Sequence, residues 1–214
     1  CDLSAPVPVE FWTQFRDSTT FWSKPCSRHR PQVLPTVATP ATFQEYCTLL
    51  DPWKQSLLSH IHSILPLEEL LSRITSPYLY LVTDGSAPPG ASFGTQGWLI
   101  ADRSTVLVDG FGPVHGLPVS SARSEALGIL AGTIAYLSLL DYLYITSPPP
   151  LSCHLDNQGA VLRVRQILTE GFSDANIKFP DSDIYQQLAA TYCHSPVHIT
   201  MNWVKGHQDS NRSL

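Results

Sequence analysis

The sequence is poor in positive charge, and this limits the partners that it can bind through charge alone. Its 214 residues hold 13 Lys and Arg against 18 Asp and Glu, a formal net charge of −5 with a pI of about 5.8. Proteins that hold nucleic acid through a broad surface are usually strongly basic. The composition argues against such a face, so any contact with nucleic acid must be local or assisted by a neighbouring domain.

Closely spaced cysteines and membrane or export signals are also lacking. The five cysteines form no C-x-x-C pair, which argues against a closed zinc site: Cys1, Cys26, Cys47, Cys153 and Cys193. We find no apolar run of about 18 residues or more. The N-terminus has no basic flank followed by an apolar core. We therefore expect a reduced, intracellular protein, cytoplasmic or nuclear, that is neither secreted nor inserted in a membrane.

The first part of the chain reads as an extension. Residues 1–40 contain six of the 18 prolines, which prevent long helices, and aromatic residues that could contact a neighbouring surface. From Thr42 to Ile74 the apolar spacing predicts two or three short helices. We assign residues 1–77 to an extension that is Pro-rich and then helical. Because the chain begins at Cys1, not Met, and stops at Leu214, we expect a piece of a longer polypeptide.

Residues 78–214 show an alternation of strands and helices that predicts an α/β domain. Three strands come first, then a long helix, a strand, two helices and a last strand. Their expected bounds are 78–83, 93–101 and 105–111 for the first strands, 121–140 for the long helix, 151–155 for the fourth strand, 158–168 for the next helix, Asp181 as the cap of the last helix and 197–204 for the last strand.

Three carboxylates fall at the ends of these elements. Asp84 ends the first strand, Asp156 ends the fourth, and Glu125 lies early in the long helix, on the apolar stripe that should face the sheet. Strand ends of an α/β sheet are where ligand sites form. If the first and fourth strands are parallel neighbours, Asp84 and Asp156 emerge side by side. Like charges at that distance repel each other unless a cation lies between them.

Each acid alone could have an ordinary structural role. Asp84 could belong to a turn with Gly85, Glu125 could stabilise a helix N-terminus or pair with Arg123, and Asp156 could cap the following helix. Together they favour a site for Mg²⁺ or Mn²⁺, which prefer oxygen ligands. Two such ions about 4 Å apart would serve phosphodiester hydrolysis. His207, beyond the last strand, could shuttle a proton.

Four motifs carry a family resemblance: VTDGS, SARSEALGIL, HLDNQGAV and WVKGHQD. In order and in position they resemble the type 1 ribonuclease H domain, and more narrowly the one attached to reverse transcriptases of retroelements. The resemblance implies a mixed five-stranded sheet flanked by helices, with its first three strands antiparallel. It also implies a two-metal site that uses Mg²⁺ or Mn²⁺ and cleaves the RNA strand of an RNA/DNA hybrid.

The same resemblance implies roles for individual residues. Asp84, Glu125 and Asp156 correspond to metal ligands, and His207 to a catalytic group. Four further residues correspond to groups that contact the hybrid, the first two at the RNA 2′-hydroxyls: Gly85, Ser86, Asn157 and Gln158.

Two departures from the family pattern affect the expectations. The family's fourth carboxylate starts a final helix, whereas this chain stops seven residues after His207 and offers only Asp209 as a weak substitute. We expect that helix to be missing and the second metal position to be weakened.

From Tyr78 onward, seven Lys and Arg stand against eleven Asp and Glu, a balance of −4. A reverse transcriptase in the same polypeptide would then supply affinity for the hybrid, and residues 1–77 resemble the segment that connects the two.

Other readings remain open on the sequence. The domain could be a decayed or truncated copy that acts as a tether. It could be another two-metal nuclease of the same fold, such as an integrase or an exonuclease, although the order Asp, Glu, Asp favours ribonuclease H. A zinc or storage role at His60 and His62, or at Cys193, His194 and His198, is the weakest alternative.

Overall fold

The computed structural model describes residues 40–206 except 91, 115, 179 and 194. The elements in chain order are α2 (Phe43–Cys47), α3 (Pro52–Leu57), β1 (His60–Ile64), α4 (Leu67–Arg73), β2 (Leu79–Ser86), β3 (Thr95–Ala101), β4 (Val106–Pro113), α5 (Ser121–Tyr142), β5 (Leu151–Leu155), α6 (Gln158–Glu170), the 3₁₀ helix η2 (Asp174–Lys178), α7 (Ser182–Cys193) and β6 (Ile199–Trp203).

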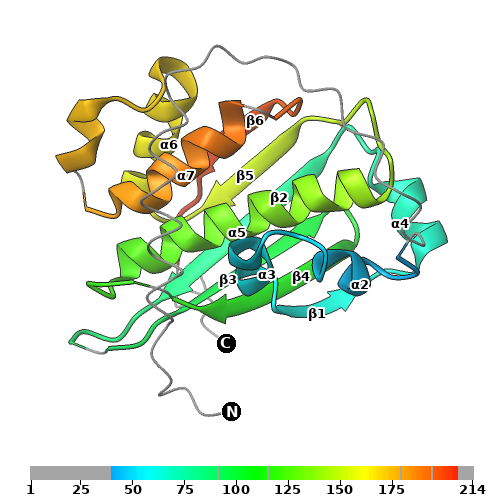
Figure 1. Cartoon of the computed structure of the whole chain (residues 1–214). Coiled ribbons are helices and arrows are strands. Elements are labelled where there is room, and N and C mark those ends of the chain that lie inside the picture. The colour runs from blue at the N-terminus through cyan, green and yellow to red at the C-terminus, as the bar shows by residue number, and fades with distance from the viewer. Residues whose placement is uncertain (1–39, 91, 115, 179, 194, 207–214) are drawn as a thin grey trace, which may run out of the picture.

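The strands form one mixed sheet in the order β1-β4-β3-β2-β5-β6. Strands β1, β4, β3 and β2 pair antiparallel, whereas β2, β5 and β6 pair parallel. Helix α5 provides the crossover from the antiparallel to the parallel part and lies across one face of the sheet, with α6 and α7 beside it (Figure 1). This arrangement confirms the predicted α/β fold of the ribonuclease H-like type, with its first three strands antiparallel and its fourth parallel to the first.

Helix α5 forms the centre of the hydrophobic core. Ser120 caps it by accepting a hydrogen bond from the Arg123 backbone N–H, and most of its side chains are buried. Its length and composition would suffice to cross a membrane, but 89% of the apolar window is buried inside the domain. Thr133 and Ser138 interrupt its apolar residues, so α5 has no unbroken apolar run of about 18 residues, and its buried side chains belong to the core.

Strand β1 corrects the reading of residues 42–74 as helices alone. Three short helices form as expected, but His60–Ile64 is a strand that pairs with the edge of β4 and widens the predicted five-stranded sheet to six strands. The apolar residues Ile61 and Ile64 fit a helical stripe equally well, so the pairing with β4 decides. The division of the chain at residue 77 stays a prediction.

The last described residues, 204–206, follow β6 without regular structure, so no helix follows this strand within the part of the chain that the structure describes. His207 and Asp209, both predicted site residues, lie outside the described residues, as does His194.

Candidate active site

The structure brings the three predicted carboxylates together. Strands β2 and β5 pair in parallel from Leu79 with Leu151 to Val82 with His154, so the chain reaches Asp84 and Asp156 at the same edge of the sheet. Glu125 comes from the second turn of α5. One ligand atom from each carboxylate lies within 4.8 Å of the other two. No other such group of His, Cys, Asp or Glu occurs among the described residues.

Gly85 explains how Glu125 comes so close to β2. A Cβ atom on Gly85 would meet the backbone of Ser124 and Glu125, and would lie 2.7 Å from the Ser124 Cβ. Only a residue without a side chain allows this approach of strand to helix. The Ser124 hydroxyl also donates a hydrogen bond to the Ser86 carbonyl at 3.3 Å. Gly85 and Ser86 therefore join β2 to α5, in addition to any contact with substrate.

Asn157, not Asp156, caps the helix that follows β5. The Asn157 side chain accepts a hydrogen bond from the Ala160 backbone N–H at 3.0 Å, and α6 begins at Gln158. The alternative role of Asp156 as a helix cap is thereby excluded, and its carboxylate is left for the cluster. Gln158 is exposed at the first position of α6, where it can reach a ligand.

The electrostatics of the cluster are dominated by Glu125. Its side chain is only 4% exposed, and its Oε2 atom has no hydrogen-bond partner among the described residues. Burial raises the pKa of Glu125 to about 8, the charges of Asp156 and Asp84 act in the same direction, and the Gly85 backbone N–H acts in the opposite one. A buried carboxylate with an unsatisfied oxygen and two acidic neighbours is costly unless a cation is bound. These residues therefore fit a divalent metal ion.

The positive charge of Arg123 is paired with carboxylates outside the cluster. Its guanidinium donates to both carboxylate oxygens of Asp183, at 3.0 and 2.6 Å, and to Asp181 Oδ1 at 3.1 Å. These bonds join the start of α5 to the start of α7. Asp181, predicted as the cap of α7, precedes the helix as expected, but its side chain binds Arg123.

Sequence reasoning missed two residues that contact Asp156. The Trp203 indole N–H donates to the Asp156 carbonyl at 2.9 Å, and Gly206 lies against the Asp156 carboxylate. These contacts could not be predicted from the order of the motifs, because they depend on which residues of β6 pair with which residues of β5.

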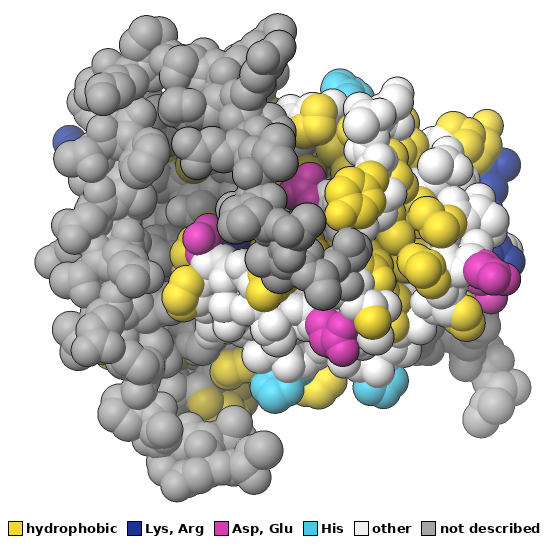
Figure 2. Space-filling model, turned by 45° about the vertical axis from the view of Figure 1, so that its right-hand side comes forward, with side chains coloured by type: hydrophobic (Ala, Val, Ile, Leu, Met, Phe, Trp, Pro, Cys, Tyr) yellow, Lys and Arg dark blue, Asp and Glu magenta, His cyan; other side chains and the backbone are white. Residues whose placement is uncertain are grey.

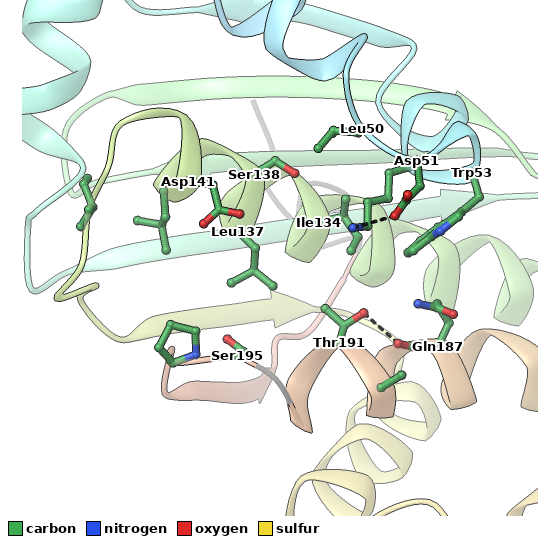
Figure 3. A pocket seen from close by; sticks show the side chains of 15 residues that line it. Leu50, Asp51, Trp53, Ile134, Leu137, Ser138, Asp141, Gln187, Thr191 and Ser195 are labelled. Carbon is green, nitrogen blue, oxygen red and sulfur yellow. Dashed lines mark hydrogen bonds and ion pairs between the residues drawn. The ribbon is translucent and has the colours of Figure 1, made fainter. Parts of the chain in front are cut away.

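A cavity of about 410 Å³ lies elsewhere, between α3, α5 and α7 (Figure 3). Its wall includes Trp53, Ile134, Asp141 and Thr191, and none of the predicted site residues. Ile134 and Asp141 are nine and sixteen positions beyond Glu125 on α5, or roughly 14 and 24 Å along the helix axis. The cavity is therefore separate from the carboxylate cluster.

His60 and His62, the first of the two zinc alternatives, contact residues of β4. Both are exposed on β1, not on a helix as the sequence suggested. The His60 ring stacks on Phe111, and His62 Nδ1 lies 3.0 Å from Asp109 Oδ2. Neither histidine belongs to a group of three metal-ligating side chains among the described residues.

Comparison with known proteins shows distant similarities to solved structures. No family model and no curated protein matches the chain. Among solved structures, it is similar to LC11-RNase H1, isolated from compost by a metagenomic approach and solved with an RNA/DNA hybrid, with 13% identity and a TM-score of 0.47 over 63% of this chain and 88% of that one.

Two further structures show similarity of the same order. One is the N-terminal RNase H domain of rv2228c from Mycobacterium tuberculosis, with 17% identity and a TM-score of 0.47 over 63% and 87% of the two chains. The other is RNase H1 from the halophilic archaeon Halobacterium salinarum, with 13% identity and a TM-score of 0.40 over 60% and 86%. The fold assignment rests on the order and direction of the strands, and the site on its own geometry.

Proposed function

We propose that this protein is a metal-dependent endonuclease that hydrolyses the RNA strand of RNA/DNA hybrids. The observation that carries the proposal is the convergence of Asp84, Asp156 and the buried Glu125, whose Oε2 has no partner among the described residues. A cluster of acids alone would be weak support. A carboxylate that the fold buries and aims at two others is what a metal site requires.

Asp84, Glu125 and Asp156 would hold Mg²⁺ or Mn²⁺, with two ions expected. When bound, such ions lower the pKa of the attacking water and stabilise the leaving oxygen of a phosphodiester. The chain itself fixes the three carboxylates: Asp84 lies two residues before the end of β2, Asp156 directly follows β5, and Glu125 lies on the core helix α5. His207 would move a proton, and Gly85, Ser86, Asn157 and Gln158 would contact the hybrid.

Binding of the hybrid would depend on a neighbouring domain. In the view of Figure 2, the described part of the surface carries mostly hydrophobic and uncharged polar side chains, with few Lys and Arg. The net charge of −5 is also unfavourable for phosphate contacts. We propose that a reverse transcriptase domain of the same retroelement polypeptide supplies these contacts, and that the protein works inside the cell.

Cleavage of an end-labelled RNA/DNA hybrid, with Mg²⁺ or with Mn²⁺, tests the proposal. Asp84→Asn should abolish cutting of the RNA strand, because it removes a carboxylate from the cluster. Asp51→Asn is the matched control, because Asp51 is exposed on the N-terminal side of α3 and forms an ion pair with Lys54, away from the cluster. Cutting that persists in Asp84→Asn would reject the assignment of the site.

A tether without catalytic activity is the second candidate. It is favoured by one observation: the described residues bring three carboxylates together and no fourth. A folded wild-type chain that leaves the hybrid intact with either ion would support the tether. Activity that appears when the chain is extended at its C-terminus would instead indicate a nuclease whose site needs the added residues.

A further inference from the structure

The position of Asp156 is set from outside its own strand. Asp156 follows the last paired residue of β5, Leu155, so the sheet hydrogen bonds end just before it. The next helix is capped by Asn157, which leaves the Asp156 side chain without a role in starting α6. The contacts that Asp156 makes with residues outside β5 and α6 therefore bear on where it lies.

Trp203 holds the backbone of Asp156. In the β5–β6 ladder Trp203 is the partner of Leu155, and the Val204 backbone N–H donates to the Leu155 carbonyl at 2.9 Å. The Trp203 indole N–H then reaches one residue further and donates to the Asp156 carbonyl at 2.9 Å. The ring itself is 48% exposed, so this hydrogen bond, more than burial of the ring, accounts for its placement.

Because Gly206 has no side chain, it leaves space for the Asp156 carboxylate. A Cβ atom on Gly206 would stand 2.9 Å from Asp156 Cγ and 3.0 Å from Asp156 Cβ, and closer still to Oδ2. These contacts are with the end of one side chain, so the carboxylate would have to move away. Such a move would change its distance from Asp84 and Glu125, whose ligand atoms now lie within 4.8 Å of it.

We propose that Trp203 and Gly206 are positioning residues for Asp156: the first fixes its carbonyl, and the second leaves space for its carboxylate. This inference rests on the proposed function, because it makes the metal affinity of the same site depend on the end of β6. Groups that orient metal ligands commonly change metal affinity or activity about 10–100-fold when they are replaced.

Calorimetric titration with Mn²⁺ tests the inference without relying on catalysis. Trp203→Phe keeps an aromatic ring and removes the N–H donor, and Gly206→Ala adds one methyl group beside the carboxylate. Each should weaken Mn²⁺ binding about tenfold or more. Trp203→Leu should match Trp203→Phe, because both lack the donor, whereas a role through ring contacts would leave Trp203→Phe close to the wild type.

Gly97→Ala is the matched control for the added methyl group. Gly97 lies opposite Asp84 in the β2–β3 ladder, but a Cβ atom there would meet nothing closer than 4.0 Å. The Gly97→Ala variant should bind Mn²⁺ with the affinity of the wild type. Urea unfolding of each variant in EDTA shows whether a change in affinity merely follows a loss of folded protein.

The outcomes separate this inference from the proposed function. Wild-type Mn²⁺ affinity in both Trp203→Phe and Gly206→Ala would overturn the positioning role, as would a loss that tracks the folded fraction. A wild-type chain that binds Mn²⁺ without cutting the hybrid, and that stays inactive when it is extended at its C-terminus, would reject the nuclease function and leave the positioning role standing. A wild-type chain that binds no Mn²⁺ would overturn both.

Discussion

The backbone of Gly85 lies directly against the backbone of Glu125. A side chain at position 85 would collide with the first turns of α5, since even the Ser124 Cβ would be 2.7 Å from an added Cβ atom. This contact brings the end of β2 and the start of α5 close enough for their carboxylates to share a site. The glycine of the DGS motif therefore has a packing role that is independent of any contact with RNA.

Gly85→Ala should destabilise the fold and separate Glu125 from Asp84. Forcing a methyl group against backbone atoms costs about 1–3 kcal/mol in free energy of unfolding. Urea unfolding measures this loss. Gly97→Ala, where the added atom has room, should be neutral or slightly stabilising. Equal stability of the two variants would show that α5 can move away from β2 at no cost.

The raised pKa of Glu125 should make the free energy of unfolding of the metal-free protein depend on pH. Its pKa is raised to about 8 in the folded state from an ordinary value of 4.5, chiefly by burial. Between these values the folded protein keeps a proton that the unfolded chain has released, so the free energy of unfolding should fall as the pH rises through this window. The slope from one such group is at most about 1.4 kcal/mol per pH unit.

Urea unfolding in EDTA from about pH 5 to pH 9, a range that spans the raised pKa, measures that slope. Glu125→Gln should flatten it, because the amide has no proton to lose, and should make the protein more stable than the wild type at the alkaline end. Asp51→Asn serves as a control for the loss of an exposed acid that is not in the cluster. An unchanged slope in Glu125→Gln would mean that other groups carry the pH dependence.

The sequence predicted much of the sheet because its strands alternate clearly. Strand β5 was predicted with its observed bounds, and α5 to within two residues at its end. Strand β1 was missed because five residues with two apolar positions fit either kind of element, and only its pairing with β4 decides between them. Local patterns describe elements well when the pattern is long enough to exclude the alternative.

The carboxylate cluster was predictable for a similar reason, since strand ends and a helix stripe can be read from the chain. The supports of the cluster were not predictable. Arg123 binds acids 58 and 60 residues away, and Trp203 donates to a carbonyl 47 residues away. Asp156 and Asn157 are adjacent, and both are residue types that cap helices. Sequence patterns do not define a helix boundary to within one residue, so they could not show which of the two caps α6.

Asp84→Asn should have opposite effects on stability with and without metal. In EDTA it removes a negative charge beside Asp156 and the buried Glu125, so the free energy of unfolding should rise by about 0.5 kcal/mol, the scale of a solvent-screened charge pair. Mg²⁺ at about ten times its Kd should stabilise the wild type by about 1.4 kcal/mol and the variant much less. Thermal unfolding with and without Mg²⁺ checks both signs; equal stabilisation of the two proteins would place the ion elsewhere.

Arg123→Met should be among the most destabilising single changes in the domain. The Arg123 and Asp181 side chains are 3% and 4% exposed, so removing the guanidinium leaves a buried carboxylate without its partner. Such a loss costs about 3–5 kcal/mol in free energy of unfolding, which urea denaturation measures. Lys54→Met, which breaks the exposed pair with Asp51, should cost less than about 1 kcal/mol.

Arg123→Lys should fall between these limits, because it keeps the charge but cannot form the two parallel bonds to Asp183. The cost in Arg123→Met has two sources, the lost hydrogen bonds and the uncompensated carboxylates, and a further variant separates them. Adding Asp181→Asn and Asp183→Asn to Arg123→Met removes both carboxylates that the guanidinium had paired, and should recover most of the loss if uncompensated charge is its main cause. No recovery would assign the cost to the hydrogen bonds that tie α7 to α5.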